Sequence, residues 1–157
     1  MADSTDQITV PVSRERLHRW ADQARGVYAD WDREWTTINE SIEDRGLTVL
    51  CQPGCVTCCY SRKFCSVSEA AAVIEYLDEN FSPEENEQFR MRTELTVGSL
   101  ARLRDDRCCE SADVFASTGG LECPFLREGN CAIYPVRPLE CRIQVATSEV
   151  NRDDCFR

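Results

Sequence analysis

Apolar residues recur at helical spacing along a long stretch near the start of the chain. Charged residues fill the positions between them, which is the pattern of an amphipathic helix. Ser13 suits an N-cap, so the pattern predicts a helix from Ser13 to about Gly46, roughly 30 residues and about 45 Å long. We expect Trp20 and His18 to lie off the apolar seam, with His18 exposed and inert. The seam has two rows: Leu17, Ala24, Trp31 and Ile38, and Ala21, Tyr28, Trp35 and Ile42.

Two further helices are predicted by their start signals. Ser66 and Glu69 have the spacing of a capping box, so a helix should begin there and end near Asn80. A capping serine, a proline at the first helical position and an acidic first turn predict another helix from Ser82 to about Arg104. The expected buried residues are Ala70, Ala71, Val73, Ile74 and Leu77 in the first of these helices and Phe89, Leu100 and Leu103 in the second.

The last forty or so residues replace helical periodicity with Cys, Pro and Gly. Two short apolar runs, 123–126 and 131–134, surround a polar turn and predict a β-hairpin. A two-residue Glu128-Gly129 turn would place Cys123 and Cys131 on opposite faces and favour two separate metal centres, whereas a three-residue turn would place them on one face and favour a shared centre. We expect the three-residue turn, because Gly129 or Asn130 can adopt the left-handed conformation that a bulged turn needs.

These elements predict a mainly α fold: a small helical domain with a long N-terminal helix and a Cys-rich loop and β-hairpin metal centre. A length of 157 residues suits a single domain, 1–157, with an arm and the long helix in 1–46 and a Cys-rich metal-binding part in 47–157. The charged span 104–120 is expected to form a short helix or a loop.

The charge balance excludes one class of function. With 28 acidic and 18 basic residues the formal net charge is −10, which repels nucleic acid and anionic membrane surfaces. No apolar run is long enough to span a membrane, and the first residues lack the features of a signal peptide. We therefore expect a cytoplasmic protein without nucleic-acid or membrane partners, in which a reducing environment keeps the eleven cysteines free of disulfides.

Four of these cysteines lie within nine residues: Cys51, Cys55, Cys58 and Cys59. Pro53 and Gly54 supply a tight turn between the first two, so the backbone can curl around a soft metal ion. The only histidine of the chain is distant in sequence. The segment 51–59, called the knuckle below, therefore predicts a metal site of all or nearly all thiolate ligands.

Four blocks of residues together resemble the signature of the CxxCxxCC (YkgJ-like) family of zinc- or iron-chelating proteins. The resemblance covers residues 51–142, with an extension to Cys155, and leaves out the long N-terminal helix. The chain is similar to the branch with a cysteine four positions before the first motif cysteine, as Cys51 is, and with a Glu-Ala pair, here Glu69-Ala70, opening the next helix. The blocks are Cys55-x2-Cys58-Cys59, Cys123-Pro-Phe-Leu, Cys131-x-Ile-Tyr and Arg137-Pro138-x2-Cys141-Arg142.

The resemblance implies a cysteine-ligated zinc or iron centre, and related domains in flagellin lysine methylases hold an iron–sulfur cluster. Eight thiolates exceed the need of one tetrahedral ion, so either two centres share them or a polynuclear cluster takes part of them. Cys65 is expected either to pack in the interior or to bind metal, and Cys108 and Cys109 fall outside the family pattern. The implied ligands are Cys51, Cys55, Cys58, Cys59, Cys123, Cys131, Cys141 and Cys155.

Arg137 and Arg142 flank the last motif cysteine, and we expect both to lie beside the thiolate ligands without binding the metal, where their guanidinium groups offset thiolate charge and hydrogen-bond to sulfur. The sequence shows no catalytic constellation. The favoured function is a cysteine-ligated metal-binding protein, with an iron–sulfur cluster or iron preferred over zinc. The alternatives are an iron-dependent enzyme or accessory subunit in peptide or protein modification, and a zinc-stabilised module whose N-terminal helix binds a protein partner or self-associates. Exposed Trp31 and Trp35 would support the last alternative, and their burial would weaken it.

Overall fold

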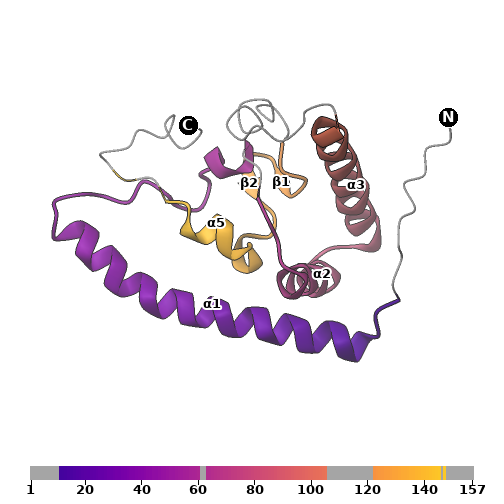
Figure 1. Ribbon diagram of the computed structural model, residues 1–157, viewed down its shortest axis with the longest axis horizontal. Helices are drawn as coiled ribbons and strands as arrows, with labels where there is room; N and C mark the ends of the chain where they lie inside the picture. The colour runs from indigo at the N-terminus through magenta and orange to yellow at the C-terminus, as the bar shows by residue number, and fades with distance from the viewer. Residues whose placement is uncertain (1–10, 61–62, 106–121, 146, 148–157) are drawn as a thin grey trace.

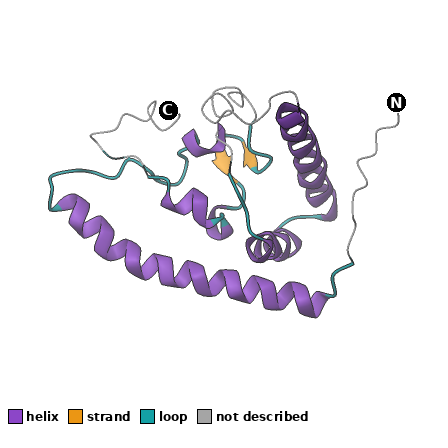
Figure 2. Cartoon of the chain, viewed as in Figure 1, coloured by secondary structure: helices purple, strands orange, loops and turns teal. Residues whose placement is uncertain are grey.

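The computed structural model describes residues 11–60, 63–105, 122–145 and 147, without the side chains of 57 and 100–105. The fold is mainly α, as predicted (Figure 1; Figure 2). Its long N-terminal helix lies along one side of the molecule, and the other elements lie above it in the view of Figure 1. The predicted element at 104–120 and the pair Cys108-Cys109 lie almost wholly outside the described residues. The elements in order are α1 (Arg14–Glu43), η1 (Thr57–Tyr60), α2 (Val67–Asn80), α3 (Pro83–Asp105), β1 (Leu126–Arg127), β2 (Asn130–Cys131), η2 (Tyr134–Val136) and α5 (Leu139–Ile143).

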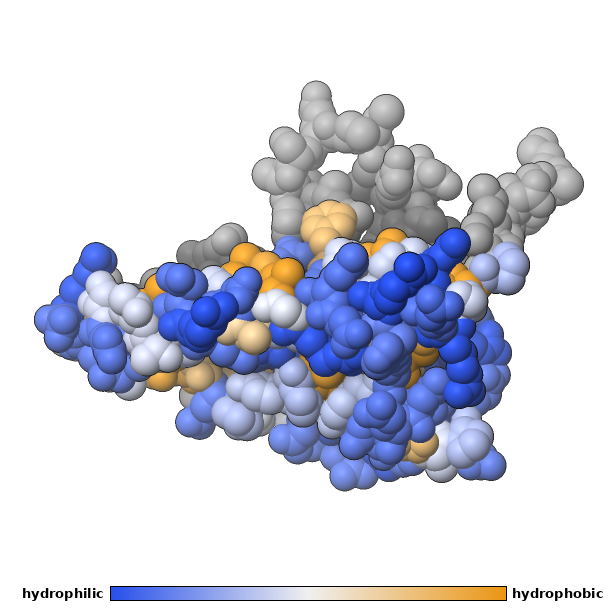
Figure 3. Space-filling view, turned by 90° about the horizontal axis from the view of Figure 1, so that it is seen from below, coloured by the Kyte–Doolittle hydropathy of each residue, from blue (hydrophilic) through white to orange (hydrophobic). Residues whose placement is uncertain are grey.

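Helix α1 begins where the sequence predicts. Ser13 has an extended backbone, and its hydroxyl accepts a hydrogen bond from the Arg16 N–H at 3.3 Å, as an N-cap does. The helix ends at Glu43, and the chain then turns at Gly46, whose positive φ of 73° suits a glycine. The face that α1 turns away from the rest of the molecule is largely hydrophilic (Figure 3).

The apolar seam of α1 packs on α2 through small side chains. Ala21, Ala24 and Tyr28 form a buried cluster with Ala71 and Ala72 of α2. Alanines at a helix contact let the two backbones approach closely. Further along the seam the indoles of Trp31 and Trp35 stack with centroids 6.0 Å apart.

Three side chains of α1 refine the sequence prediction. Trp20, expected off the seam, is partly buried against the α1–α2 cluster, so that expectation was wrong. Trp31 and Trp35 are half-buried, an intermediate state that neither supports nor weakens a partner-binding role for α1.

Helix α2 contains the predicted capping box and ends at the predicted Asn80. The Ser66 hydroxyl accepts from the Glu69 N–H at 3.2 Å, and the Glu69 carboxylate accepts from the Ser66 N–H at 2.8 Å. The prediction that Ile74 is buried was wrong, since it is 45% exposed. Because α2 packs on α1 on one side and on α3 and the hairpin region on another, its buried arc includes Ala72, and Ile74 falls outside this arc.

A second core cluster joins α2, α3 and the C-terminal segment. Phe89 of α3 is buried with Val73, Leu77 and Ile133. Helix α3 starts with the expected capping geometry, because the Glu85 carboxylate accepts from the Ser82 N–H at 3.0 Å. The side chains of Leu100 and Leu103, expected in its apolar stripe, lie outside the described part.

The hairpin has the turn that we did not favour. Leu126 pairs with Cys131 and Arg127 with Asn130, which leaves a two-residue turn of Glu128 and Gly129. Both turn residues have positive φ, 50° and 75°. These angles are those of a type I′ turn, whose twist matches that of the flanking strands. The three-residue prediction was therefore wrong.

None of the helices among the described residues is both long enough and apolar enough to cross a bilayer.

Candidate metal centre

The knuckle curls as its sequence predicts. The Cys55 N–H donates to the Gln52 carbonyl at 2.9 Å, and Gly54 has a φ of 91°. Proline at the second position of a turn and a glycine of positive φ at the third are the signature of a type II turn. The 3-10 helix η1 follows at once and carries Cys58 and Cys59.

Cys59 is the centre of a group of three thiols. Its side chain hydrogen-bonds with the side chains of both Cys58 and Cys123. The backbone reinforces this contact, because the Cys123 N–H donates to the Cys59 carbonyl at 2.7 Å. The start of the hairpin region is therefore fixed against the end of the knuckle.

Cys131 and Cys141 lie close enough to this group for their charges to interact with it. Burial raises the pKa of Cys131, and the charges of Cys123 and Cys58 raise it further. Burial also raises the pKa of Cys141, to about 12, with smaller contributions from Cys58, Cys123 and Cys131. Thiols from the knuckle, the hairpin and α5 thus lie within range of one another's charges. Cys123 lies before β1 and outside the paired strands. The two-residue turn therefore does not place it on the opposite face of the hairpin from Cys131, which is what the sequence predicts for a turn of that length.

Two thiols of this group favour the thiolate form. The hydrogen bond from Cys59 lowers the pKa of Cys58 to about 6, against the effect of burial and with help from the charges of Lys63 and Arg137. The hydrogen bond from Cys59 likewise lowers the pKa of Cys123 to about 7. Thiolate is the form that binds metal, and because the single S–H of Cys59 donates to one sulfur at a time, either Cys58 or Cys123 is prepared as a ligand at a given moment.

The other predicted ligands have different positions. Cys51 is half-buried, and its thiol donates to the Gln144 carbonyl just after α5 at 3.8 Å. Cys55 is also half-buried, next to Gly54, and a Cβ on Gly54 would lie 3.8 Å from the Asn130 side chain of the hairpin. Cys65 is exposed, which contradicts interior packing. Cys155 lies outside the described residues.

The gathered thiols do not yet form a coordination sphere. Within the residues that the structure describes, no set of three or more Cys, His, Asp or Glu side chains converges on a common point as metal ligands do. The chemistry of the donors nevertheless fits a soft metal, since every one is sulfur and cations lie beside them.

Sequence reasoning missed two of the cations near the thiols. Lys63 lies just past the knuckle, hydrogen-bonds to the Gln144 side chain, and lowers the pKa of Cys58. Arg92 of α3 donates to the Leu126 carbonyl at 2.9 Å and lowers the pKa of Cys123. Lys63 could have been suspected from its place in the sequence, but nothing local marks Arg92.

The two arginines singled out in the sequence differ in position. The charge of Arg137 lowers the pKa of Cys58, and its guanidinium lies over the Tyr134 ring, 4.2 Å from the centroid. The Arg142 guanidinium instead donates hydrogen bonds to two backbone carbonyls, that of Pro135 at 2.6 Å and that of Arg137 at 3.0 Å. It also lies 4.2 Å from the centroid of the Tyr28 ring, so it joins the Cys141 segment to α1.

Glu69 has a contact beyond its cap that the sequence does not predict. Its carboxylate accepts from the Leu139 N–H at 2.6 Å, at the start of α5. Burial opposes its ionisation, but the backbone hydrogen bonds from Leu139 and Ser66 outweigh burial and lower its pKa.

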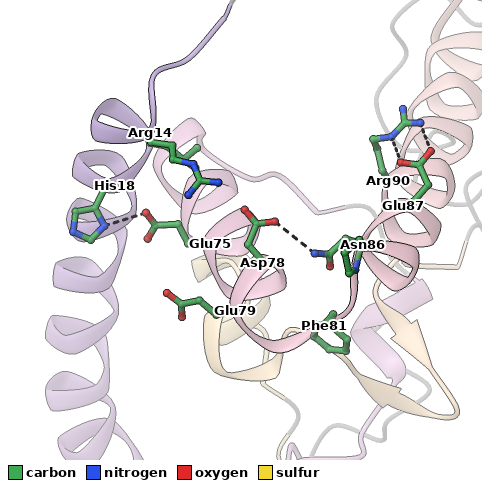
Figure 4. A pocket seen from close by; sticks show the side chains of 11 residues that line it. Arg14, His18, Glu75, Asp78, Glu79, Phe81, Asn86, Glu87 and Arg90 are labelled. Carbon is green, nitrogen blue, oxygen red and sulfur yellow. Dashed lines mark hydrogen bonds and ion pairs between the residues drawn. The ribbon is translucent and has the colours of Figure 1, made fainter.

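A groove of about 850 Å³ lies apart from the thiols, among α1, α2 and α3. Its walls are mostly charged and contain no cysteine (Figure 4). The Glu75 carboxylate contacts the His18 ring at 3.0 Å, and Asp78 accepts from the Asn86 amide at 3.5 Å. His18 is exposed, as expected, but it serves to tie α1 to α2.

Comparison with known proteins supplies a family. The CxxCxxCC family, described as a candidate zinc- or iron-chelating domain, matches residues 50–155, which confirms the resemblance seen in the sequence and its extension to Cys155. Neither a curated protein nor a solved structure matches the chain.

Proposed function

Since the chain belongs to the CxxCxxCC family of metal-chelating domains, we propose that it binds iron, as an iron–sulfur cluster or as an iron ion, in preference to zinc. Metal binding itself follows from the family. The choice of iron over zinc rests on the resemblance to domains that hold iron–sulfur clusters.

The observation that carries the proposal is that thiols from three distant segments lie within range of one another's charges. Cys58 and Cys59 come from η1, Cys123 and Cys131 from the hairpin region, and Cys141 from α5. Five thiols exceed the four that a tetrahedral zinc ion takes. A polynuclear cluster, or two ions that share ligands, accounts for the surplus.

The residues around the thiols suit a negatively charged centre. Thiolates around a divalent ion leave an excess of negative charge, and nearby cationic side chains offset it and can hydrogen-bond to sulfur. In our proposal Lys63 and Arg137 do this for Cys58 and its neighbours, and Arg92 does it for Cys123. Cys51 and Cys55 supply the remaining ligands of the knuckle.

The proposal places the protein in the cytoplasm. The eight described cysteines are all free thiols. A reducing compartment keeps thiols available for metal, whereas an oxidising one would pair them.

The test is anaerobic purification followed by measurement of iron, zinc and acid-labile sulfide and by an absorption spectrum. We expect a coloured protein with iron, and sulfide if the iron is in a cluster. A colourless protein with stoichiometric zinc and no sulfide would refute the preference for iron. A protein that takes up neither metal when reconstituted anaerobically would refute the function itself.

A further inference from the structure

Glu69 connects two parts of the chain that are 70 residues apart. One carboxylate oxygen accepts from the Ser66 N–H at 2.8 Å, and the other accepts from the Leu139 N–H at 2.6 Å. A single side chain thus closes the N-terminal cap of α2 and holds the first residue of α5.

The double contact requires a carboxylate. Both partners are N–H donors, and each takes a different oxygen of Glu69. A glutamine has one oxygen, and its NH₂ group would face the second donor. Glutamine still serves in a capping box, so Glu69→Gln should keep the cap of α2 and lose the bond to Leu139.

The bond to Leu139 fixes the start of the short helix that carries Cys141, while the contacts of Arg142 hold the same segment on α1. Helix α5 has only five residues, too few to fix its own orientation. Within it the Cys141 N–H donates to the Pro138 carbonyl at 2.9 Å, so the cysteine follows the first turn that Glu69 holds.

From this geometry, and resting on the proposed function, we propose that Glu69 is a positioning residue for the metal centre: it holds Cys141 within reach of Cys58 and Cys123. In this proposal Glu69 does not bind metal itself; its charge acts on the nearby Cys65 thiol, whose pKa is raised by partial desolvation and further by Glu69. It sets the place of one ligand by fixing the backbone two residues before it.

Glu75 supplies a matched control on the same helix. Its carboxylate also ties α2 to another part of the chain, with contacts of 2.9 Å to Arg25 and 3.0 Å to His18 of α1. Glu75→Gln therefore makes the same chemical change to a bridging carboxylate without contact to α5. A second variant, Leu139→Pro, removes the N–H from the other side of the contact; Pro138 already has an extended backbone, with ψ 153°, that a following proline tolerates.

The experiment titrates the full-length metal-free variants anaerobically with Co²⁺, whose thiolate charge-transfer absorption reports sulfur ligands, and follows helix content by circular dichroism. We expect Glu69→Gln and Leu139→Pro to lower Co²⁺ affinity about 10- to 100-fold, the range found when a residue that orients a metal ligand is lost, and to weaken the absorption per bound ion. Glu75→Gln should match the wild type in Co²⁺ affinity and in absorption per bound ion. In a Cys141→Ser background, Glu69→Gln should cost no further affinity, because the ligand that it places is gone.

Three results would overturn the inference. The first is a Glu69→Gln protein that binds Co²⁺ as the Glu75→Gln protein does. The second is an equal loss with and without Cys141, which would mean a general effect on folding. The third, a wild type that binds neither Co²⁺ nor iron, would refute the proposed function as well, so the two failures are distinguishable.

Discussion

Replacement of Arg142 by alanine should lower the free energy of unfolding of the metal-free protein by about 3 kcal/mol, because one side chain holds the segment 135–143 on α1. The Arg142 side chain is only 10% exposed. Its guanidinium donates to the carbonyls of Pro135 and Arg137, lies over the Tyr28 ring, and pairs with Asp32 at 3.1 Å.

The magnitude follows from these contacts taken in turn. Hydrogen bonds from a charged donor contribute about 1.5–3 kcal/mol each, but the two carbonyls regain water once the side chain is removed, so we count about 2 kcal/mol for both. The cation–π contact adds about 1 kcal/mol. The pair with Asp32, which is 64% exposed, adds little. For a chain of this size a loss of about 3 kcal/mol lowers Tm by roughly 6–12 °C.

Urea denaturation followed by circular dichroism measures the change. Arg142→Lys keeps the charge over Tyr28 but not the planar fork, so we expect about half the loss. Arg33→Ala is the control, since that arginine also lies beside an aspartate, Asp30, but its side chain is 78% exposed; it should cost less than about 0.5 kcal/mol. Equal midpoints for Arg142→Ala and Arg33→Ala would refute the reasoning.

Three further predictions concern the centre, the hairpin and pH. Cys58→Ser should abolish stoichiometric metal in the purified protein, whereas Cys65→Ser, which changes an exposed thiol, should retain it. An equal loss of metal from both variants in elemental analysis would show that our division of the cysteines into metal ligands and non-ligands is wrong. Glu128→Asn should raise the free energy of unfolding by about 0.5 kcal/mol, because asparagine tolerates the positive φ of a type I′ turn better than glutamate does, and a lower urea midpoint would contradict that turn. The pKa of Glu69 in the folded protein lies below its ordinary 4.5. The contribution of the carboxylate to the free energy of unfolding is therefore fully present above pH 4.5 and is lost as the pH falls through the folded pKa. The stability difference between wild type and Glu69→Gln, measured in urea from pH 7 down to 3, should therefore be constant near neutrality and shrink in acid, and a difference that grows in acid would contradict the shift.

Features set by neighbouring residues could be predicted from the sequence. Ser13, the capping box of Ser66 and Glu69, and the proline-glycine turn of the knuckle all act over a few residues, and each forms as expected. Ile74 was misplaced because α2 is covered on more than one side, which no single-helix pattern contains. The hairpin register was missed because Glu128 accepts a conformation that its residue type disfavours.

The grouping of the thiols depends on contacts between distant segments. The family resemblance joined the knuckle cysteines with Cys123, but it did not indicate that Cys59 bonds to both Cys58 and Cys123 or that Cys51 contacts the Gln144 carbonyl. The link between Glu69 and Leu139 spans 70 residues and leaves no local signal at either end. Such contacts follow from the packing of α2 against the C-terminal segment, and that packing cannot be read from a single sequence.

The distribution of the thiols along the chain also has a consequence for biosynthesis. Cys58 and Cys59 leave the ribosome roughly 80 residues before Cys141, a delay of roughly 4–16 s at about 5–20 residues per second. During that interval the early thiols lack the partners that surround them in the fold, including the Cys123 backbone that bonds to Cys59. A nascent chain is therefore open to stray metals and oxidants until translation is nearly complete, and cells that produce the protein under oxidative stress should accumulate damage at the early cysteines first.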